Sequence, residues 1–344
     1  MIMNSQSIIS RLAERRSLSE EEAYGVCVDI LGGSLAPVEV SAILMGLRVK
    51  GEESQEIRGF LRALRDNAVR VKGGDVIDIV GTGGDGLNTI NASTLASIVV
   101  SSLGIPVAKH GNRGFSSVSG SADLMEALGY PIEHRVEVAE KMLELEGFVY
   151  LYAPNYHRAL RNVSPVRKRL GIRTIFNIAA PLANPASPGI QVVGAPSIDI
   201  ARILASTIEK LGVRGFAVVT GYPGMDEVSP LGPSRVILRT AREAGELVIQ
   251  PEKLGVRGIG LESISGKTME EVLGRGIKGL RGEDRASSVF IALNAGLALY
   301  IAGYAGSIEE GYERAIAEMI SGRAWRKLES IVRTARRLSG IGPG

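Results

Sequence analysis

The 344-residue sequence contains few of the residues that mark several common classes of protein. It has a single cysteine, Cys27, so no disulfide can form within the chain, and a reducing cytoplasm is the expected location. Three histidines and one cysteine are too few for a typical zinc site. Aromatic residues make up only 5% of the chain, which argues against a surface on which nucleic-acid bases stack.

Long apolar runs are also missing. The best candidate, residues 95–108, is interrupted by serines and by Pro106, so we expect no membrane span. Charged residues begin too early at the N-terminus for the apolar core of a signal peptide. At 45% hydrophobic and 22% charged residues, the composition is that of an ordinary globular protein. A chain of this length is expected to form two or three units around a sizeable core.

Secondary-structure signals divide the chain near residue 70. The first 66 residues carry only helix signals, with a capping box at Ser19 and Glu22 and a further cap expected at Ser54. After residue 75, short β-branched runs alternate with helical stretches, which predicts a mostly parallel sheet covered by helices. The expected strands are 76–80, 105–108, 148–152, 191–194 and 216–220.

We therefore predict an α/β protein with a small N-terminal helical domain and a large α/β domain that has a mostly parallel central sheet. The helical domain is expected to span residues 1–70, and the α/β domain residues 71–344. Residues 164–186 also look helical, and we expect this segment to join the helical domain in space.

A glycine-rich loop follows the first expected strand, at residues 81–86. Its glycines let backbone N–H groups approach a phosphate, and the helix that opens after it favours anions at its N-terminus. The loop also matches the dinucleotide fingerprint, but that interpretation needs an acid roughly 20 residues later, and none occurs between Asp85 and Asp123. No Gly-Lys-Ser/Thr follows, so this is no P-loop. A purely structural glycine turn is the remaining alternative.

A second polar loop, from Lys109 to Arg113, follows the second expected strand and has several serines behind it. Open α/β sheets bind ligands at the carboxyl ends of their strands, where the two loops would meet. Two cations, an amide and several hydroxyls suit the second loop to an anion. Each residue alone has an ordinary explanation, as a packed histidine or a plain loop, but the two loops together predict a phosphate site.

Residues 148–197 contain no acid, yet they carry a cluster of basic residues. A solvated basic helix explains most of them, while one or two arginines could face a carboxylate or a phosphate. A nucleic-acid groove is another alternative, against which the scarcity of aromatic residues counts. The cluster comprises His157, Arg158, Arg161, Arg167, Lys168, Arg169 and Arg173.

Two adjacent carboxylates, Asp226 and Glu227, follow the expected strand 216–220. Mg²⁺ favours a few carboxylates together with water and substrate phosphates over a full protein cage. The pair is therefore a candidate magnesium site, and a solvent-exposed acidic turn is the alternative.

Taken together, these stretches resemble the anthranilate phosphoribosyltransferase family. The resemblance runs in family order from about Ser41 to beyond Asn294. The segment 109–113 is its most specific part, because related pyrimidine nucleoside phosphorylases share the fold but carry Lys-His-Ser at that loop. Departures from the family pattern occur at Ala92, Val118 and Ala180. The segments that carry the resemblance are 81–85, 91–94, 109–113, 119–123, 166–168, 171–174 and 226–227.

The resemblance implies transfer of a phosphoribosyl group from phosphoribosyl pyrophosphate to the amine of anthranilate, with release of pyrophosphate, in tryptophan biosynthesis. It implies a cytoplasmic homodimer that uses two Mg²⁺ ions per site, with no membrane or nucleic-acid partner. Two other functions stay open: a pyrimidine nucleoside phosphorylase-like enzyme, and a nucleic-acid-binding paralogue without activity, which an isoelectric point near 8.9 and the acid-free stretches favour.

The same resemblance implies roles for individual residues. Lys109, Asp226 and Glu227 are the implied catalytic residues, and Ser93 joins the two acids as a magnesium ligand. Anthranilate is expected near Gly81, Asn112, His157 and Arg167. The implied phosphoribosyl pyrophosphate site comprises Gly81, Gly84, Asp85, Thr89, Asn91, Ser93, Thr94, Lys109, His110, Gly111, Asn112, Arg113, Ser116, Ser117 and Ser121.

Overall fold

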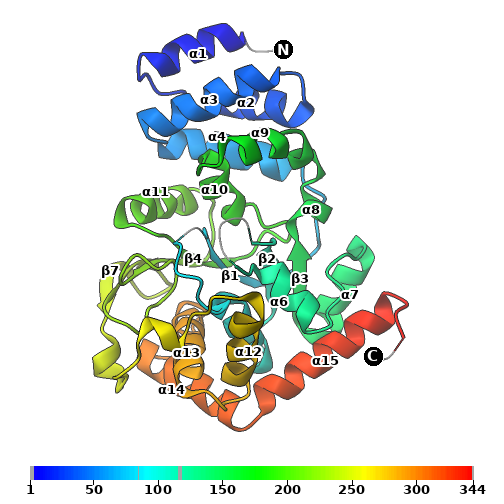
Figure 1. The fold of residues 1–344 in the computed structure, drawn as a ribbon, viewed down its shortest axis with the longest axis vertical. Coiled ribbons are helices and arrows are strands. Elements are labelled where there is room, and N and C mark those ends of the chain that lie inside the picture. Colours follow the sequence, from blue (N-terminus) through cyan, green and yellow to red (C-terminus); the bar gives the residue numbers. More distant parts are fainter. Residues whose placement is uncertain (1–3, 84, 115–117, 343–344) are drawn as a thin grey trace.

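The computed structural model of the chain describes residues 4–83, 85–114 and 118–342. A group of N-terminal helices lies at one end of the molecule, and the rest of the chain surrounds a sheet (Figure 1). The N-terminal helices are α1 (Ser5–Ala13), α2 (Glu20–Gly32), α3 (Pro37–Lys50) and α4 (Ser54–Asp66).

Local signals set where these helices begin. The capping box at the start of α2 is confirmed, because Ser19 Oγ accepts from Glu22 N at 3.3 Å and Glu22 Oε2 accepts from Ser19 N at 2.9 Å. The expected cap at Ser54 is wrong. Ser54 is the first residue of α4, and Glu53 takes the cap position because the Glu56 carboxylate accepts from Glu53 N at 2.9 Å.

Within the described residues, seven strands form one sheet in the order β3-β2-β1-β4-β5-β6-β7. The first five in that order are parallel, and β6 and β7 pair antiparallel, so the prediction of a mostly parallel sheet is confirmed. The strands are β1 (Ile77–Gly81), β2 (Val107–Gly111), β3 (Phe148–Tyr152), β4 (Ile190–Gly194), β5 (Gly215–Gly221), β6 (Ser234–Arg239) and β7 (Ala244–Ile249).

The expected strands differ from the observed ones mainly at their ends. The strand 148–152 matches β3, whereas the strand expected at 105–108 continues through Lys109 and His110 to Gly111. It does so because the parallel ladder with β3 extends to the pair Gly111–Tyr152. Strands β6 and β7 were not predicted, and β7 is exposed along most of its length and lacks the apolar alternation of a half-buried strand.

The other helices pack around the sheet. Helix α13 is almost entirely buried and contacts α5 and α14, while α7 packs on β3 and α11 on β5. None of the helices in the described ranges is long and apolar enough to cross a membrane. The helices are α5 (Ala92–Ser102), α6 (Ser121–Ala127), α7 (Val136–Glu146), α8 (Ala153–Tyr156), α9 (Ser164–Leu170), α10 (Ile175–Ala179), α11 (Ile198–Glu209), α12 (Met269–Leu280), α13 (Arg285–Ile301), α14 (Ile308–Ile320) and α15 (Arg323–Leu338).

Helices α9 and α10 lie against the N-terminal helices rather than on the sheet (Figure 1). Helix α9 contacts α3, and Phe176 of α10 packs edge-on against Phe60 of α4 with ring centroids 5.3 Å apart. Arg65 at the end of α4 donates to the carbonyl oxygen of Leu182 at 2.9 Å. The chain therefore crosses between the helical part and the sheet before β1, after β3 and before β4.

The two faces of the sheet border different apolar clusters. Ile79 and Val192 belong to a cluster with α5 and α13, whereas Val80 and Val193 belong to one with the N-terminal helices and α11. Successive side chains on a strand point to opposite faces, which produces this division. The sheet is thus buried on both sides, and its strand ends are the places where polar groups can meet.

Candidate active site

The strands β2, β1, β4 and β5 are parallel neighbours, so their carboxyl ends lie side by side at one end of the sheet. We call this place the strand edge. After β1 the chain adds β2 on one side, and after β4 it adds β5 on the other, so the strand order reverses between β1 and β4. Open α/β sheets bind ligands in the crevice at such a reversal. The glycine loop and the adjacent acids follow β1 and β5 at this edge, whereas Lys109 to Gly111 of the second predicted loop are the last residues of β2 itself.

Two glycines make room for an acid between these strand ends. Gly81 and Gly194 pair in register at the ends of β1 and β4. A Cβ atom on Gly194 would lie 1.5 Å from the backbone oxygen of Asp226, and one on Gly81 would lie 2.3 Å from Asp226 Oδ2. Gly83 N donates to the same carboxylate oxygen at 2.6 Å. Asp226 therefore packs directly against the glycine loop and accepts a hydrogen bond from it. Gly194, which leaves room for the Asp226 backbone, was not identified from the sequence.

Asp226 and Glu227 are both nearly buried, each 8% exposed. Glu227 Oε1 accepts from the backbone N of Ser93 at the start of α5, at 2.8 Å. Burial, reinforced by the nearby charge of Asp85, raises the pKa of Asp226 to about 6. Burial and the charge of Asp226 raise the pKa of Glu227 well above its usual value. The negative charges of these two buried carboxylates are therefore not balanced by a neighbouring cation among the described residues.

This pair fits a magnesium ion. Neither acid forms an ion pair in the part of the chain that the structure describes, so a cation would balance their charge. Within the described ranges, no group of three or more His, Cys, Asp or Glu side chains could hold a metal by itself. The remaining ligands would come from water and substrate, which is the usual arrangement for Mg²⁺.

Lys109 lies in β2 and is only 2% exposed. Its ammonium group donates to the carbonyl oxygen of His110 at 3.1 Å. Burial lowers the pKa of Lys109, and the charges of Asp78, Glu227 and Asp226 act in the opposite direction. The lysine therefore lies in the same electrostatic environment as the carboxylate pair.

Helix α5 connects the glycine loop with the second loop. Asn91, its N-cap residue, accepts from Ser119 Oγ at 3.2 Å and donates to Ser119 O at 3.4 Å. Thr94 is fully buried, and its hydroxyl has no hydrogen-bond partner among the described residues. Thr89 lies just before the helix and forms a bridge with Ser265.

The end of β2 is closely packed. A Cβ atom on Gly111 would lie 2.2 Å from Ser121 Oγ and 2.5 Å from the Tyr150 hydroxyl. These two hydroxyl oxygens lie 2.8 Å apart. Ser121 is therefore engaged with β3 in this structure. Gly84, Ser116 and Ser117, which the sequence placed in the phosphate site, lie outside the described residues.

Arg113 is exposed and its charge is balanced locally. Its guanidinium pairs with Asp123 at 3.2 Å, donates to Glu126 at 2.9 Å, and lies 5.7 Å from the centre of the Tyr152 ring. Asn112 is also exposed, and its side-chain oxygen accepts from Arg113 N at 2.8 Å. Arg113 thus differs from Lys109, which has no carboxylate within ion-pair distance in the described ranges.

His157 lies at the end of α8, on the helical side of the site. Its Nε2 donates to the carbonyl oxygen of Ala183 at 2.8 Å, because a carbonyl can only accept, and its Nδ1 is buried without a partner in the described residues. The ring centroids of His157 and His110 lie 5.3 Å apart. Burial lowers the pKa of both imidazoles, so both are neutral at pH 7.

Arg167 of α9 is half-buried, and its guanidinium lies near two residues of α10. Its Nη2 donates to Asn177 Oδ1 at 3.2 Å, and its guanidinium lies 5.5 Å from the centre of the Phe176 ring. Burial lowers the pKa of Arg167, and no carboxylate pairs with it in the described ranges. A guanidinium in this position is suited to a ligand carboxylate.

Sequence reasoning placed Arg173 in the basic cluster without giving it a role. It lies between α9 and α10, where burial lowers the pKa of its guanidinium and the nearby charges of Asp226 and Asp85 act in the opposite direction. One nitrogen of its guanidinium, Nη2, is buried without a hydrogen-bond partner in the described residues. Its segment, Gly171 to Thr174, was among those that carried the family resemblance, which was the available signal.

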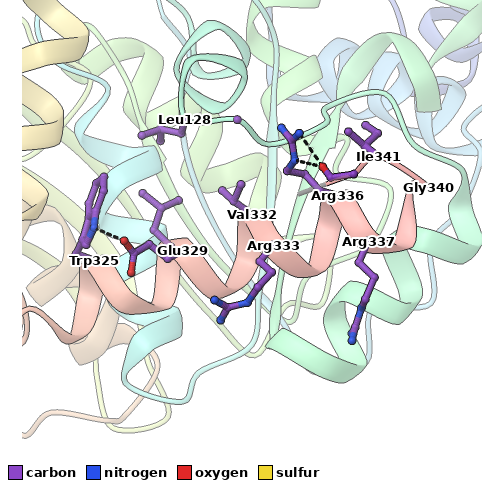
Figure 2. A pocket seen from close by; sticks show the side chains of 12 residues that line it. Leu128, Trp325, Glu329, Val332, Arg333, Arg336, Arg337, Gly340 and Ile341 are labelled. Atoms are coloured by element: carbon purple, nitrogen blue, oxygen red, sulfur yellow. Dashed lines mark hydrogen bonds between the residues drawn. The ribbon is translucent and has the colours of Figure 1, made fainter. Parts of the chain in front are cut away.

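A groove of about 790 Å³ lies away from the strand edge, along α15 (Figure 2). Leu128, Val332 and Ile341 are among its apolar lining residues. Its polar groups are partly engaged with each other, because Trp325 Nε1 donates to Glu329 at 2.9 Å and Arg336 donates to Gly342 O. None of its lining residues belongs to the expected site, so cavity size alone does not locate the site.

Comparison with known proteins defines the class. The chain matches a glycosyl transferase family in both of its parts, the helical bundle domain at residues 6–68 and the a/b domain at residues 73–325. It therefore has the two-part architecture of that class.

Full-length relatives define the family more narrowly. Anthranilate phosphoribosyltransferase of Aeropyrum pernix is 45% identical over 95% of this chain and 96% of its own. The crystal structure of that enzyme from Thermus thermophilus has a TM-score of 0.88 and 39% identity, with 96% and 99% of the chains covered. The enzyme from Saccharomyces cerevisiae in complex with phosphoribosyl pyrophosphate and Mg has a TM-score of 0.87 and 27% identity, with 97% and 98% covered. The chain belongs to the anthranilate phosphoribosyltransferase family, which confirms the resemblance.

Proposed function

We propose that the chain transfers the phosphoribosyl group of phosphoribosyl pyrophosphate to the amine of anthranilate and releases pyrophosphate, a step of tryptophan biosynthesis. The observation that carries the proposal is the buried pair Asp226 and Glu227 beside the glycine loop. It occurs in a chain that is related over almost its whole length to anthranilate phosphoribosyltransferases. The activity is that of a pentosyltransferase.

The phosphates of the donor would lie at the strand edge. Backbone N–H groups of the glycine loop, the N-terminus of α5 and the ammonium group of Lys109 suit phosphate oxygens. Ser93, Asp226 and Glu227 would hold magnesium, with two ions per site expected. Bound there, magnesium would act as a Lewis acid that neutralises charge on the leaving pyrophosphate.

The anthranilate would lie on the helical side. Arg167, whose charge is unbalanced within the described residues, would receive its carboxylate, and Asn112 and His157 would line the same place. The amine of an aniline is neutral at pH 7, so the transfer needs no strong general base. Residues of α9 would hold the amine towards ribose C1, and such positioning contributes roughly 7–11 kcal/mol in favourable cases.

A homodimer is part of this proposal. Val38, Met45 and Val49 are 73%, 37% and 61% exposed on α3. Their spacing places them on one face of the helix, and an exposed apolar stripe of this kind suits a second copy of the chain. A purely monomeric protein in sedimentation equilibrium at micromolar concentration would contradict this part. Buried Cys27, the only cysteine in the sequence, supports a reducing cytoplasm.

The fluorescence of anthranilate provides the test. Loss of this fluorescence that requires the chain, phosphoribosyl pyrophosphate and Mg²⁺ together is the expected result. Release of base from uridine or thymidine with phosphate, in place of that loss, would favour a nucleoside phosphorylase. Binding to DNA with a steep salt dependence and no transfer would favour a nucleic-acid-binding protein.

A further inference from the structure

The groove along α15 is a cavity that the proposed transfer does not use (Figure 2). Its volume of about 790 Å³ lies within the range of roughly 300–1,000 Å³ that is usual for small-molecule sites. Positions 325, 328, 332 and 336 of α15 line it at the spacing of one helix face, and residues 128–129 and 340–342 lie alongside. At 1.5 Å per residue, the lined part of α15 is roughly 16 Å long. The groove therefore has room for a molecule with more than one ring.

Most of the lining of this groove is apolar. Val332 is half-buried, and Ile341 is 43% exposed. Trp325 lines one end, where the guanidinium of Arg281 lies 3.9 Å from the centre of the indole ring. The indole N–H is already donated to Glu329 at 2.9 Å, so the ring contributes apolar surface rather than a hydrogen bond. A flat aromatic body suits this part of the groove.

The charge of the groove is positive, because three arginines line it together with a single acid, Glu329. Arg336 donates through Nε and Nη2 to the carbonyl oxygen of Gly342, at 3.1 and 2.8 Å, so its guanidinium is engaged. Arg333 and Arg337 are exposed, and neither has an ion pair or a side-chain hydrogen bond within the described residues. Two guanidiniums therefore remain available to an anion.

The basic and apolar sides of the groove lie opposite each other. Figure 2 shows Arg333 and Arg337 on one side of α15, and Leu128 and Ile341 on the other. The two arginines are at i and i+4 on one helix face, where like charges repel, and an anion between them would relieve that repulsion. Guanidinium groups bind the oxygens of carboxylates and phosphates through pairs of N–H groups. The arrangement matches a molecule that has both an aromatic body and an anionic group.

We propose that the groove along α15 is a binding site for a small aromatic anion, with the rings against Trp325 and Val332 and the anionic group at Arg333 and Arg337. The volume fits a small molecule better than a second protein chain, whose interface would bury a much larger surface. The site does not depend on the proposed transfer, since none of its lining residues belongs to the strand edge.

The test uses two dyes that share one ring system. The dye 8-anilinonaphthalene-1-sulfonate is an aromatic anion, and N-phenyl-1-naphthylamine is its uncharged counterpart without the sulfonate. Trp325 is the only tryptophan of the sequence, so quenching of tryptophan fluorescence in the full chain reports a dye bound near the groove. We expect both dyes to quench it. The sulfonate should bind about tenfold more tightly, the size of effect expected for a charge-assisted hydrogen bond.

A double variant tests the anionic end of the site. Arg333→Gln with Arg337→Gln should weaken binding of the sulfonate about tenfold and change binding of the uncharged dye less than about twofold. The matched control is Arg135→Gln with Arg326→Gln, which changes the net charge equally at two exposed arginines outside the groove. This control should leave binding of both dyes unchanged. Equal weakening of the two dyes by the groove variant would overturn the anionic part of the proposal.

A second variant tests the apolar part. Val332→Phe fills space in the groove without adding a tryptophan, so it should weaken both dyes at least about tenfold. Unchanged binding in Val332→Phe, or no quenching of Trp325 by either dye up to ~1 mM, would overturn the proposal. Should Val332→Phe not fold, Ile341→Glu at an exposed position must weaken the sulfonate more than the uncharged dye. Self-association in sedimentation equilibrium that Val332→Phe abolishes would assign the groove to a second copy of the chain instead.

Discussion

At the strand edge, Asp226 and Glu227 each accept from a backbone N–H, and both are nearly buried. On the helical side, Arg167 has a single side-chain hydrogen bond among the described residues, to Asn177. The first set is held by the register of parallel strands, in which Gly81 faces Gly194. The second is held by two short helices, α9 and α10. In the proposed function, the phosphates would therefore bind at the ends of the parallel strands, and the amine on the part that packs with the N-terminal helices.

The largest effect should come from breaking the strand-edge half. Asp226→Asn with Glu227→Gln removes both charges while keeping the shapes of the side chains. We expect kcat/KM to fall at least ~10³-fold, because charge stabilisation of the leaving group by a metal is worth several kcal/mol. Steady-state kinetics over a range of Mg²⁺ concentrations measures the effect.

The matched control for that variant is Glu309→Gln with Glu313→Gln. Both of these acids are exposed on α14 or at its start, and the change in net charge is the same. The control should keep full activity. Near-normal turnover in the Asp226–Glu227 variant, with circular dichroism showing an intact fold, would remove the metal from this site.

A smaller effect should come from the helical half. Arg167→Ala should raise the KM for anthranilate by ~10–100-fold, the range expected for loss of one charged hydrogen-bonding partner. The donor KM should stay within about twofold, since Arg167 contacts no residue of the strand edge. Arg169→Ala, which changes an exposed arginine of the same helix, is the control. An unchanged anthranilate KM would take Arg167 out of the site and leave the helical half without an anchor.

The smallest effect concerns stability at the place where the two halves meet, the contact between His110 and His157. Burial lowers the pKa of both rings, so the unfolded chain binds more protons than the folded one below pH ~6.5. The free energy of unfolding should therefore fall as the pH drops below that value, by at most ~1.4 kcal/mol per pH unit for each ring. Urea unfolding of the chain and of His157→Asn between pH 7.5 and 5.5 measures this. An identical pH dependence in the two proteins contradicts the assignment to His157.

Local sequence patterns were enough for part of this architecture. The glycine loop, the Lys109–Arg113 segment and the adjacent acids are contiguous motifs, and strand β3 is a continuous apolar run, so each could be recognised without knowledge of its neighbours. The parallel sheet followed from the alternation of strands and helices. Membership of the family followed from the order of the motifs along the chain.

Features that depend on contacts between distant segments could not be obtained in this way. Gly194 matters only because Asp226 lies against it, and the electrostatic influence of Asp226 and Asp85 on Arg173 arises only in the folded chain. The exposed edge strand β7 has no apolar alternation that would mark it. Arg113, expected to meet a phosphate, is paired with two acids of α6, a contact that its own loop does not reveal. Its role in donor binding stays a prediction.

The hydrogen bond between Gly83 and Asp226 also has a consequence for the order in which the site forms during folding. Gly83 and Asp226 meet across 143 positions of sequence, so the proposed metal site requires that β1, β4 and the turn after β5 have assembled. A nascent chain that has made only the glycine loop and α5 carries the recognisable motif but no place for the ion. Magnesium affinity at the proposed site should consequently report completed sheet formation, and a chain truncated before residue 226 should lack this affinity altogether.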